Sequence, residues 1–223
     1  MTSAVIPARN EADRIAATLG ALAAVEGVDE VIVVDDGSTD ATADAAAMHG
    51  ARVVVHARNL GKGAALETGV RSARGEILLL LDADLGDTAA QAALLLDPVR
   101  RGEADMAIAM FPVVPGRGGG MGLVVRLARW GIRRAAGREM AAPLSGQRAL
   151  KREVWDRARH TDRGFGVETG LTIDALRAGF RVVEVPTTMT HRVTGRDVRG
   201  VVHRARQFRD VALALWARRG TRC

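Results

Sequence analysis

The chain has 223 residues, of which 48% are hydrophobic and 3% aromatic, and it carries a formal net charge of +6 at pH 7. This length suits one compact domain with a full core, and the apolar content excludes a disordered, low-complexity chain. The single cysteine, Cys223, cannot form an internal disulfide, which favours a reducing compartment.

No segment of the sequence predicts export or membrane insertion. Residues 1–7 are too short for a signal peptide, and the charged residues Arg9 and Glu11 follow at once. The longest apolar runs, such as 77–81, fall far short of the roughly 20 residues that span a bilayer. We therefore expect a cytoplasmic protein that is either soluble or peripheral on the inner face of the plasma membrane.

The first half of the chain alternates short apolar runs with helical patterns. Strands are predicted at 3–6, 30–34, 52–55, 76–81 and 105–110, and helices at 11–25, 40–48, 63–74 and 85–101. Ser38 or Thr39 is expected to cap the second helix. Strands that are apolar on both faces and separated by helices predict an α/β fold, with a mostly parallel central sheet flanked by helices.

The second half is less regular. The glycine- and proline-rich segment 112–122 predicts a mobile loop, with Gly116 to Gly120 as a flexible lid. It is followed by a basic helix at 123–136, a turn and short strand at 143–150, a helix at 167–178, extended pieces at 181–185 and 188–191, and a basic helix at 197–219. Without an internal repeat or a linker, residues 1–223 are expected to form a single domain.

Arginine dominates residues 117–138 and 192–222, whereas Asp and Glu are common before residue 110. This asymmetry suits a phosphate-rich partner, such as a nucleotide, a lipid phosphate, a membrane surface or a nucleic acid; the alternative is a set of solvated helix faces. A nucleic acid is the least favoured partner, because stacking aromatics and any named nucleic-acid-binding motif are missing. The sequence is also compatible with a homodimer.

Asp82-Ala83-Asp84 directly follows the apolar run 77–81. Buried carboxylates need a metal, a base or exposure to water, and two at this spacing can share a divalent cation with the oxygens of a diphosphate. The alternative is that the two aspartates cap a helix that starts near Leu85.

Two further segments also follow predicted strands. Asp35 and Asp36 precede Gly37-Ser38, where they could accept hydrogen bonds from a base or a ribose, or simply form a capped turn. Lys62, in Asn59-Leu60-Gly61-Lys62-Gly63, precedes a helix whose N-terminus could face anionic groups, although the spacing is not that of a Walker A loop. Ligands bind beyond the carboxyl ends of parallel strands, so these segments are expected on one rim of the sheet.

Taken in order, these motifs resemble the family 2 glycosyltransferases with the GT-A fold. The resemblance rests on Pro7-Ala8-Arg9-Asn10-Glu11, Val34-Asp35-Asp36-Gly37-Ser38, Asn59-Leu60-Gly61-Lys62-Gly63 and Asp82-Ala83-Asp84-Leu85, and more weakly on Ser145-Gly146-Gln147-Arg148 and Gly164-Phe165-Gly166-Val167-Glu168. Within the family, the chain looks most like dolichyl- or polyprenyl-phosphate sugar synthases and glucosyl-3-phosphoglycerate synthases. The resemblance implies a Rossmann-like GT-A fold, with residues 1–111 binding the nucleotide-sugar and the irregular half 112–223 binding the acceptor.

The resemblance also implies roles for single residues. The donor-nucleotide contacts would be Pro7, Ala8, Arg9, Glu11, Asp35, Asp36, Lys62 and Asp82. Asp84 and Glu168 would serve catalysis, and Asp82, Asp84 and His191 would hold Mg²⁺ or Mn²⁺. Arg117, Arg126, Arg148 and Arg192 would hold an acceptor phosphate. A structural role for His191 and a helix-dipole role for Glu168 are the alternatives.

The function expected from the sequence is metal-dependent transfer of a sugar from a UDP- or GDP-sugar to a phosphorylated acceptor. Polyprenyl phosphate is the preferred acceptor, because the basic helices at 123–136 and 197–219 could rest on an anionic membrane. The alternative acceptor is a small soluble compound such as 3-phosphoglycerate. A second class, nucleotidyl transfer to a sugar phosphate, is less favoured because the first strand is not followed by a glycine-rich loop with Arg and Lys.

Overall fold

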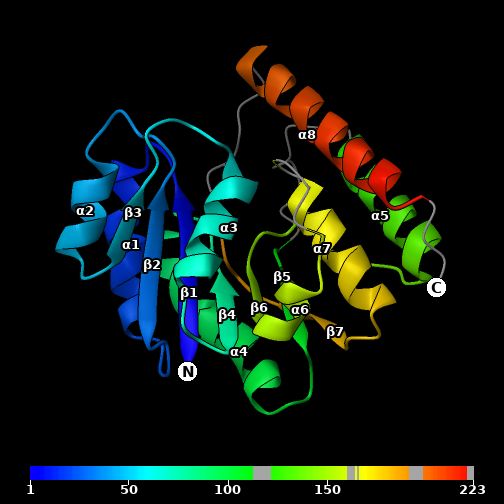
Figure 1. The fold of residues 1–223 in the computed structure, drawn as a ribbon, viewed down its shortest axis with the longest axis horizontal. Coiled ribbons are helices and arrows are strands. Elements are labelled where there is room, and N and C mark those ends of the chain that lie inside the picture. The colour runs from blue at the N-terminus through cyan, green and yellow to red at the C-terminus, as the bar shows by residue number, and fades with distance from the viewer. Residues whose placement is uncertain (113–121, 160–163, 165, 191–197, 220–223) are drawn as a thin grey trace.

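The structure is a computed structural model that describes residues 1–112, 122–159, 164, 166–190 and 198–219. Figure 1 shows a central sheet with helices packed on both faces, and α5 and α8 lying side by side at one end of the molecule. The predicted loop at 112–122 and its glycine-rich lid fall almost entirely outside the described residues.

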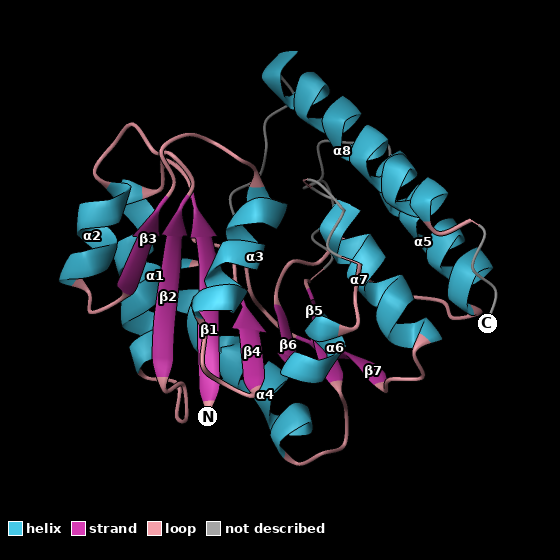
Figure 2. Ribbon diagram, in the orientation of Figure 1, coloured by secondary structure: helices cyan, strands magenta, loops and turns pink. Residues whose placement is uncertain are grey.

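Seven strands form one sheet in the order β3-β2-β1-β4-β6-β5-β7 (Figure 2). The strands are β1 (Thr2–Ala8), β2 (Glu30–Asp35), β3 (Arg52–Val55), β4 (Ile77–Leu80), β5 (Met106–Met110), β6 (Arg148–Lys151) and β7 (Val182–Pro186). β6 runs antiparallel to both of its neighbours, β4 and β5, whereas the other paired strands are parallel. The prediction of a mostly parallel sheet is therefore confirmed.

The helices are α1 (Ala12–Ala23), α2 (Thr42–Met48), α3 (Lys62–Ser72), α4 (Ala92–Arg100), α5 (Leu123–Ala136), α6 (Arg152–Asp156), α7 (Gly166–Arg177) and α8 (Val198–Ala217), with a 3-10 helix η1 (Gly86–Gln91). Alternate residues of β1 enter different cores. Ile6 belongs to the core cluster that includes residues of α1 and α4, and Val5 belongs to the cluster that includes residues of α3, α5, α7 and α8. This alternation explains why the buried strands read as unbroken apolar runs in the sequence.

Three local expectations are wrong. The predicted helix at 85–101 starts at Gly86, which has a positive φ of 55°, and its first part forms the 3-10 helix η1 before α4 begins at Ala92. Residues 188–190 lie outside any strand, since the backbone N–H groups of Thr188 and Thr190 donate to side chains of η1 instead of a strand ladder. Neither Ser38 nor Thr39 caps α2; the Asp40 carboxylate accepts from the backbone N–H of Thr42.

α6 was not expected from the sequence. It is a single short turn that follows β6 directly, and its first residue, Arg152, donates to three backbone carbonyls at the end of α3 and just beyond it.

None of the helices in the described part of the chain combines the length and the hydropathy that crossing a bilayer requires.

Asp105 joins the ends of three neighbouring strands. Its carboxylate accepts hydrogen bonds from Lys151 Nζ at 2.7 Å and from the backbone N–H of Arg181 at 2.8 Å. Burial of this carboxyl works against ionisation, but the hydrogen bonds from Arg181 and Lys151 outweigh it and hold the pKa of Asp105 well below its usual range.

Asp105→Asn is expected to lower the free energy of unfolding by about 1–3 kcal/mol at neutral pH, because hydrogen bonds to a charged acceptor are lost. The folded-state pKa lies below the unfolded value of about 3.9, so this stability is present above that value and is lost as the pH falls toward the folded-state pKa. Urea denaturation from neutral pH down to about pH 3 tests the prediction, with the solvent-exposed Glu103→Gln as the control. An equal deficit at every pH would contradict it.

Candidate active site

The predicted segments converge on the rim formed by the carboxyl ends of β1, β2 and β4. Pro7 and Ala8 end β1, Asp35 ends β2, and Asp82 lies two residues beyond β4. Lys62 begins α3, and Glu168 lies in the first turn of α7. Segments far apart in the sequence thus meet at one edge of the sheet, as expected for an open α/β sheet.

The turn Asp82-Ala83-Asp84 is held in place by a hydrogen bond from α1. Ala83 is buried in the core, and its carbonyl accepts a hydrogen bond from Thr18 Oγ1 at 2.8 Å. The same hydroxyl accepts from the backbone N–H of Gly86 at 2.9 Å. No side chain caps η1, whose N-cap residue is Leu85, so the capping alternative for the two aspartates finds no support.

The Lys62 ammonium bridges two carboxylates. Its Nζ lies 2.7 Å from Asp82 Oδ1 and 2.8 Å from Glu168 Oε1. Gln147 Nε2 donates to the second Asp82 oxygen, Oδ2, at 2.9 Å. Burial works against the charge of the ammonium, but Asp82 and Glu168 outweigh it and raise the pKa of Lys62 above its usual value. Three elements, α3, the turn after β4 and α7, are therefore held together by one cation.

Several buried polar atoms beside this bridge have no hydrogen-bond partner within the described residues. They are Ser145 Oγ, Gln147 Oε1, Arg148 Nη2, Glu168 Oε2 and Thr169 Oγ1. An unpaired buried polar group costs about 1–3 kcal/mol, so a group of them calls for a partner such as water or a bound polar ligand. All five come from two short segments, 145–148 and 168–169.

The two adjacent aspartates at the end of β2 have different partners. Asp36 uses both oxygens, since Oδ1 accepts from the backbone N–H of Leu60 and contacts His56 Nδ1, both at 2.8 Å, and Oδ2 accepts from the N–H of Gly61 at 2.8 Å. His56 Nε2 in turn lies 3.0 Å from Thr68 Oγ1 on α3. Asp36 therefore orders the loop that leads into Lys62.

Asp35 is bound on one side only. Its Oδ1 accepts from the backbone N–H of Ser38 at 3.0 Å and from the Ser38 hydroxyl. No described residue donates to Asp35 Oδ2 in the hydrogen bonds of the structure. One carboxylate oxygen thus remains available at the rim.

The loop after β1 is tied to the loop after β2. Asn10 has a positive φ of 55°, a conformation in which asparagine is enriched. Its backbone N–H donates to Ser38 Oγ at 3.0 Å, and its side chain accepts from the N–H of Thr39 at 2.8 Å. Arg9 is exposed beside this junction, and the backbone N–H of Glu11 donates to Thr42 Oγ1 at 2.9 Å.

The arginines predicted for an acceptor phosphate are scattered. Arg148 is buried, and its guanidinium donates to the carbonyl of Ser145 and to Thr172 Oγ1. Burial lowers the pKa of Arg148 to about 10, so the side chain still carries its charge at neutral pH. Arg126 is exposed on α5. Arg117 and Arg192 lie outside the described residues.

His191, predicted as a metal ligand, also lies outside the described residues. Among the residues that the structure describes, no group of three or more His, Cys, Asp or Glu side chains comes together. Asp82 and Asp84 remain as two carboxylates, separated by Ala83 and both partly exposed, in a turn fixed by Thr18. Asp82 already binds a cation, the Lys62 ammonium. Carboxylates are the ligands that a hard divalent ion takes in proteins, so Asp82 and Asp84 would be the residues to hold one here.

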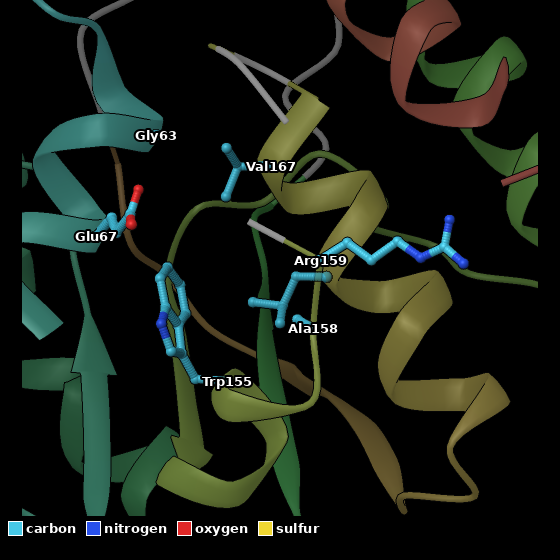
Figure 3. A pocket seen from close by; sticks show the side chains of 7 residues that line it. Gly63, Glu67, Trp155, Ala158, Arg159 and Val167 are labelled. Carbon is cyan, nitrogen blue, oxygen red and sulfur yellow. The ribbon is translucent and has the colours of Figure 1, made fainter. Parts of the chain in front are cut away.

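A small pocket lies between α3, α6 and α7 (Figure 3). Its wall includes the Trp155 indole, and the Glu67 carboxylate and Val167 also line it. The Arg159 side chain extends away from these groups and donates to the carbonyl of Ala217. The pocket and the ion bridge use the same two helices, because Gly63 and Lys62 are both in α3 and Val167 and Glu168 are both in α7.

Sequence reasoning missed four residues that shape this site: Asn10, Thr18, His56 and Gln147. Gln147 belonged to a segment with family resemblance, but nothing in its own pattern pointed to Asp82. His56 and Thr18 act through contacts between elements, which spacing along the chain does not reveal.

Three comparisons with known proteins identify the family and the fold. The family model for glycosyl transferase family 2 matches residues 3–158. The glycosyltransferase AglJ of Haloferax volcanii is 34% identical over 196 residues, which cover 86% of this chain and 63% of AglJ. The glucosyl-3-phosphoglycerate synthase of Mycolicibacterium paratuberculosis is 33% identical over 194 residues, which cover 77% of this chain and 59% of that enzyme. The chain thus spans about six tenths of the length of these two relatives.

Among solved structures, glucosyl-3-phosphoglycerate synthase from Mycobacterium tuberculosis, in complex with Mn²⁺, UDP-glucose and phosphoglyceric acid, has a TM-score of 0.82 and 29% identity. The match covers 100% of this chain and 81% of that one, and the predicted GT-A fold is confirmed. The chain belongs to glycosyl transferase family 2.

Proposed function

We propose that this enzyme transfers a sugar from a UDP-sugar to a small phosphorylated acceptor, with Mn²⁺ or Mg²⁺ as the metal. The observation that carries the proposal is the Lys62 bridge between Asp82 and Glu168, beside buried polar atoms that lack partners. Similar enzymes bind such compounds: structures of glucosyl-3-phosphoglycerate synthase contain UDP-glucose with phosphoglyceric acid or glycerol 3-phosphate. These relatives favour the small acceptor over the polyprenyl phosphate preferred from the sequence.

The donor nucleoside is assigned to the half formed by residues 1–111. Asp35 Oδ2 is the oxygen that accepts from a base N–H or a ribose hydroxyl, because both Asp36 oxygens are already used. Pro7, Ala8 and Arg9 border the same rim. Asp36 contributes indirectly, by holding the loop before Lys62.

The diphosphate is assigned to the turn after β4. Asp82 and Asp84 would hold the divalent ion, which when bound offsets the negative charge on the departing nucleoside diphosphate. Lys62 adds a positive charge at the same place, and its contacts with Asp82 and Glu168 fix the ammonium before the substrate arrives. Such preorganised charge contributes more to rate than a mobile side chain.

The acceptor is assigned to the half formed by residues 112–223. Glu168 keeps one oxygen, Oε2, without a partner among the described side chains, and Gln147 Oε1 is in the same condition. Both are hydrogen-bond acceptors, which suits the hydroxyl groups of the donor sugar or of the acceptor. Membership in family 2 favours this glycosyl transfer over nucleotidyl transfer.

Asp84→Ala is expected to remove the metal-dependent part of nucleotide binding. With Mn²⁺ and UDP near 100 times the dissociation constant, the unchanged protein should gain about 5–10 °C in Tm, whereas the variant should gain little. Thermal shift with and without the metal measures this effect. Asp87→Ala, which removes an exposed carboxylate three residues away, is the matched control. An equal metal-dependent shift in Asp84→Ala would overturn the metal assignment.

Gly146→Ala is expected to disturb the ion bridge without unfolding the protein. An added Cβ would lie 2.6 Å from Lys62 Nζ and 3.3 Å from both Asp82 oxygens, and the end of a lysine side chain can move away. Because misplacement by about 1 Å can reduce rates about 100-fold, kcat/KM should fall by about 10- to 100-fold with little change in Tm. Gly20→Ala, where a Cβ meets nothing within 4 Å, should leave kcat/KM unchanged. Unchanged turnover in Gly146→Ala would refute a role for the bridge.

The acceptor is identified by product formation from UDP-glucose and Mn²⁺. 3-Phosphoglycerate, glycerol 3-phosphate and detergent-solubilised polyprenyl phosphate serve as parallel acceptors, and mass spectrometry detects the glycosylated product. We expect transfer to a small phosphorylated compound. Transfer to polyprenyl phosphate alone would overturn this acceptor class while leaving sugar transfer intact.

A further inference from the structure

Exposed tryptophans and arginines lie on both α5 and α8 and in the turn that follows α8. We call this surface the α5–α8 face. Its apolar members are Leu123, Trp130, Leu213 and Trp216, and its arginines are Arg126, Arg129, Arg133, Arg134, Arg206, Arg209 and Arg219. The two helices lie side by side in Figure 1 and pack closely, since a Cβ on Gly131 of α5 would meet the Leu215 side chain of α8 at 2.2 Å.

The apolar side chains of this face are unusually exposed. Trp216 is 66% exposed, Leu213 55% and Trp130 51%. The opposite sides of the same helices are buried, at Ile132 on α5 and at Val211 on α8. Each helix thus buries one side in the core and exposes further large apolar side chains to solvent on the other, which is typical of a contact surface.

The charge of this face selects the partner. α5 contains no acidic residue, and the single acid of α8, Asp210, is buried and paired with Arg209. Within the described part of the chain, Arg126, Arg133, Arg134 and Arg206 make no ion pair. A second copy of the chain, placed symmetrically, would bring arginines against arginines. An anionic lipid surface would neutralise them instead, and tryptophan is the residue enriched at the level of lipid headgroups.

We propose that the α5–α8 face docks this enzyme on an anionic membrane surface, with Trp130 and Trp216 in the headgroup layer and the arginines on lipid phosphates. A helix pair with aromatic and aliphatic groups among arginines is typical of binding in the plane of the interface. The proposal goes beyond the proposed function, because it holds for either acceptor class.

Docking on this face would place the membrane close to the acceptor side of the site. α8 packs against the start of α7, where a Cβ on Gly166 would lie 2.7 Å from the carbonyl oxygen of Asp210. Glu168 follows Gly166 by two residues on the same helix. The docking helix and the first turn of α7 are therefore in direct contact, and the proposed membrane surface lies on the other side of α8.

Tryptophan fluorescence gives a direct test with the full chain. Two of the three tryptophans lie on the face, and the third, Trp155, is buried. Vesicles of phosphatidylglycerol and phosphatidylcholine should co-sediment the protein and shift its emission to shorter wavelength, and brominated lipid should quench it. Pure phosphatidylcholine should give little binding, and high salt should weaken binding to the anionic vesicles.

Variants separate the two contributions. The pair Trp130→Ala and Trp216→Ala should weaken vesicle binding about tenfold or more, as should Arg133→Glu with Arg134→Glu. The milder pair Trp130→Phe and Trp216→Phe should retain binding but remove the emission shift, because only Trp155 remains. Matched controls away from the face are Leu94→Ala on α4 and Arg14→Glu with Arg71→Glu, which should bind as the unchanged protein does.

Failure to co-sediment with anionic vesicles would overturn the proposal. So would a stable dimer in light scattering without lipid that the Trp130→Ala and Trp216→Ala pair dissociates, since the face would then bind a second copy. Nucleotide-dependent thermal shift, measured on every variant, shows whether the donor site is intact. Loss of vesicle binding with that shift retained separates this proposal from the proposed sugar transfer.

Discussion

The Lys62 ammonium is the point on which the site depends. It joins the turn after β4 to the first turn of α7 through Asp82 and Glu168. Lys62 is also the first residue of α3, and Asp36 binds the loop that precedes it. One cation therefore links three segments that are distant in sequence. Burial of an unpaired charge would be costly, so the lysine and its two carboxylates stabilise one another only as a set.

The donor half could be predicted well because its signals are local. Apolar runs followed by Asp35-Asp36 or Asp82 identify a strand end and its ligand groups together, and the order of strands and helices implies a common rim. The division of the predicted helix at 85–101 into η1 and α4 was missed, because short 3-10 turns are common at the start of α-helices and the sequence shows one continuous helical pattern there.

The acceptor half was harder to predict for a physical reason. Gln147 reaches Asp82 across 65 positions of sequence, and Arg148 is buried by α7, so neither role follows from neighbouring residues. The predicted acceptor arginines illustrate the limit. A positive charge in the sequence does not distinguish a guanidinium that packs inside, such as Arg148, from one that faces out on α5, such as Arg126.

The reversed direction of β6 has a consequence for how the two halves communicate. Leu80 at the end of β4 pairs with Arg148 at the start of β6, so the segment that precedes β6 lies at the rim where the carboxyl ends of the parallel strands lie. Every parallel strand offers only its exit loop to this edge, whereas β6 offers its entrance. The antiparallel direction of β6 thus brings Gln147, from the later half of the chain, to Asp82 in the earlier half. Substitutions in the loop before β6 can therefore change the Gln147–Asp82 hydrogen bond while the strand pairing is preserved.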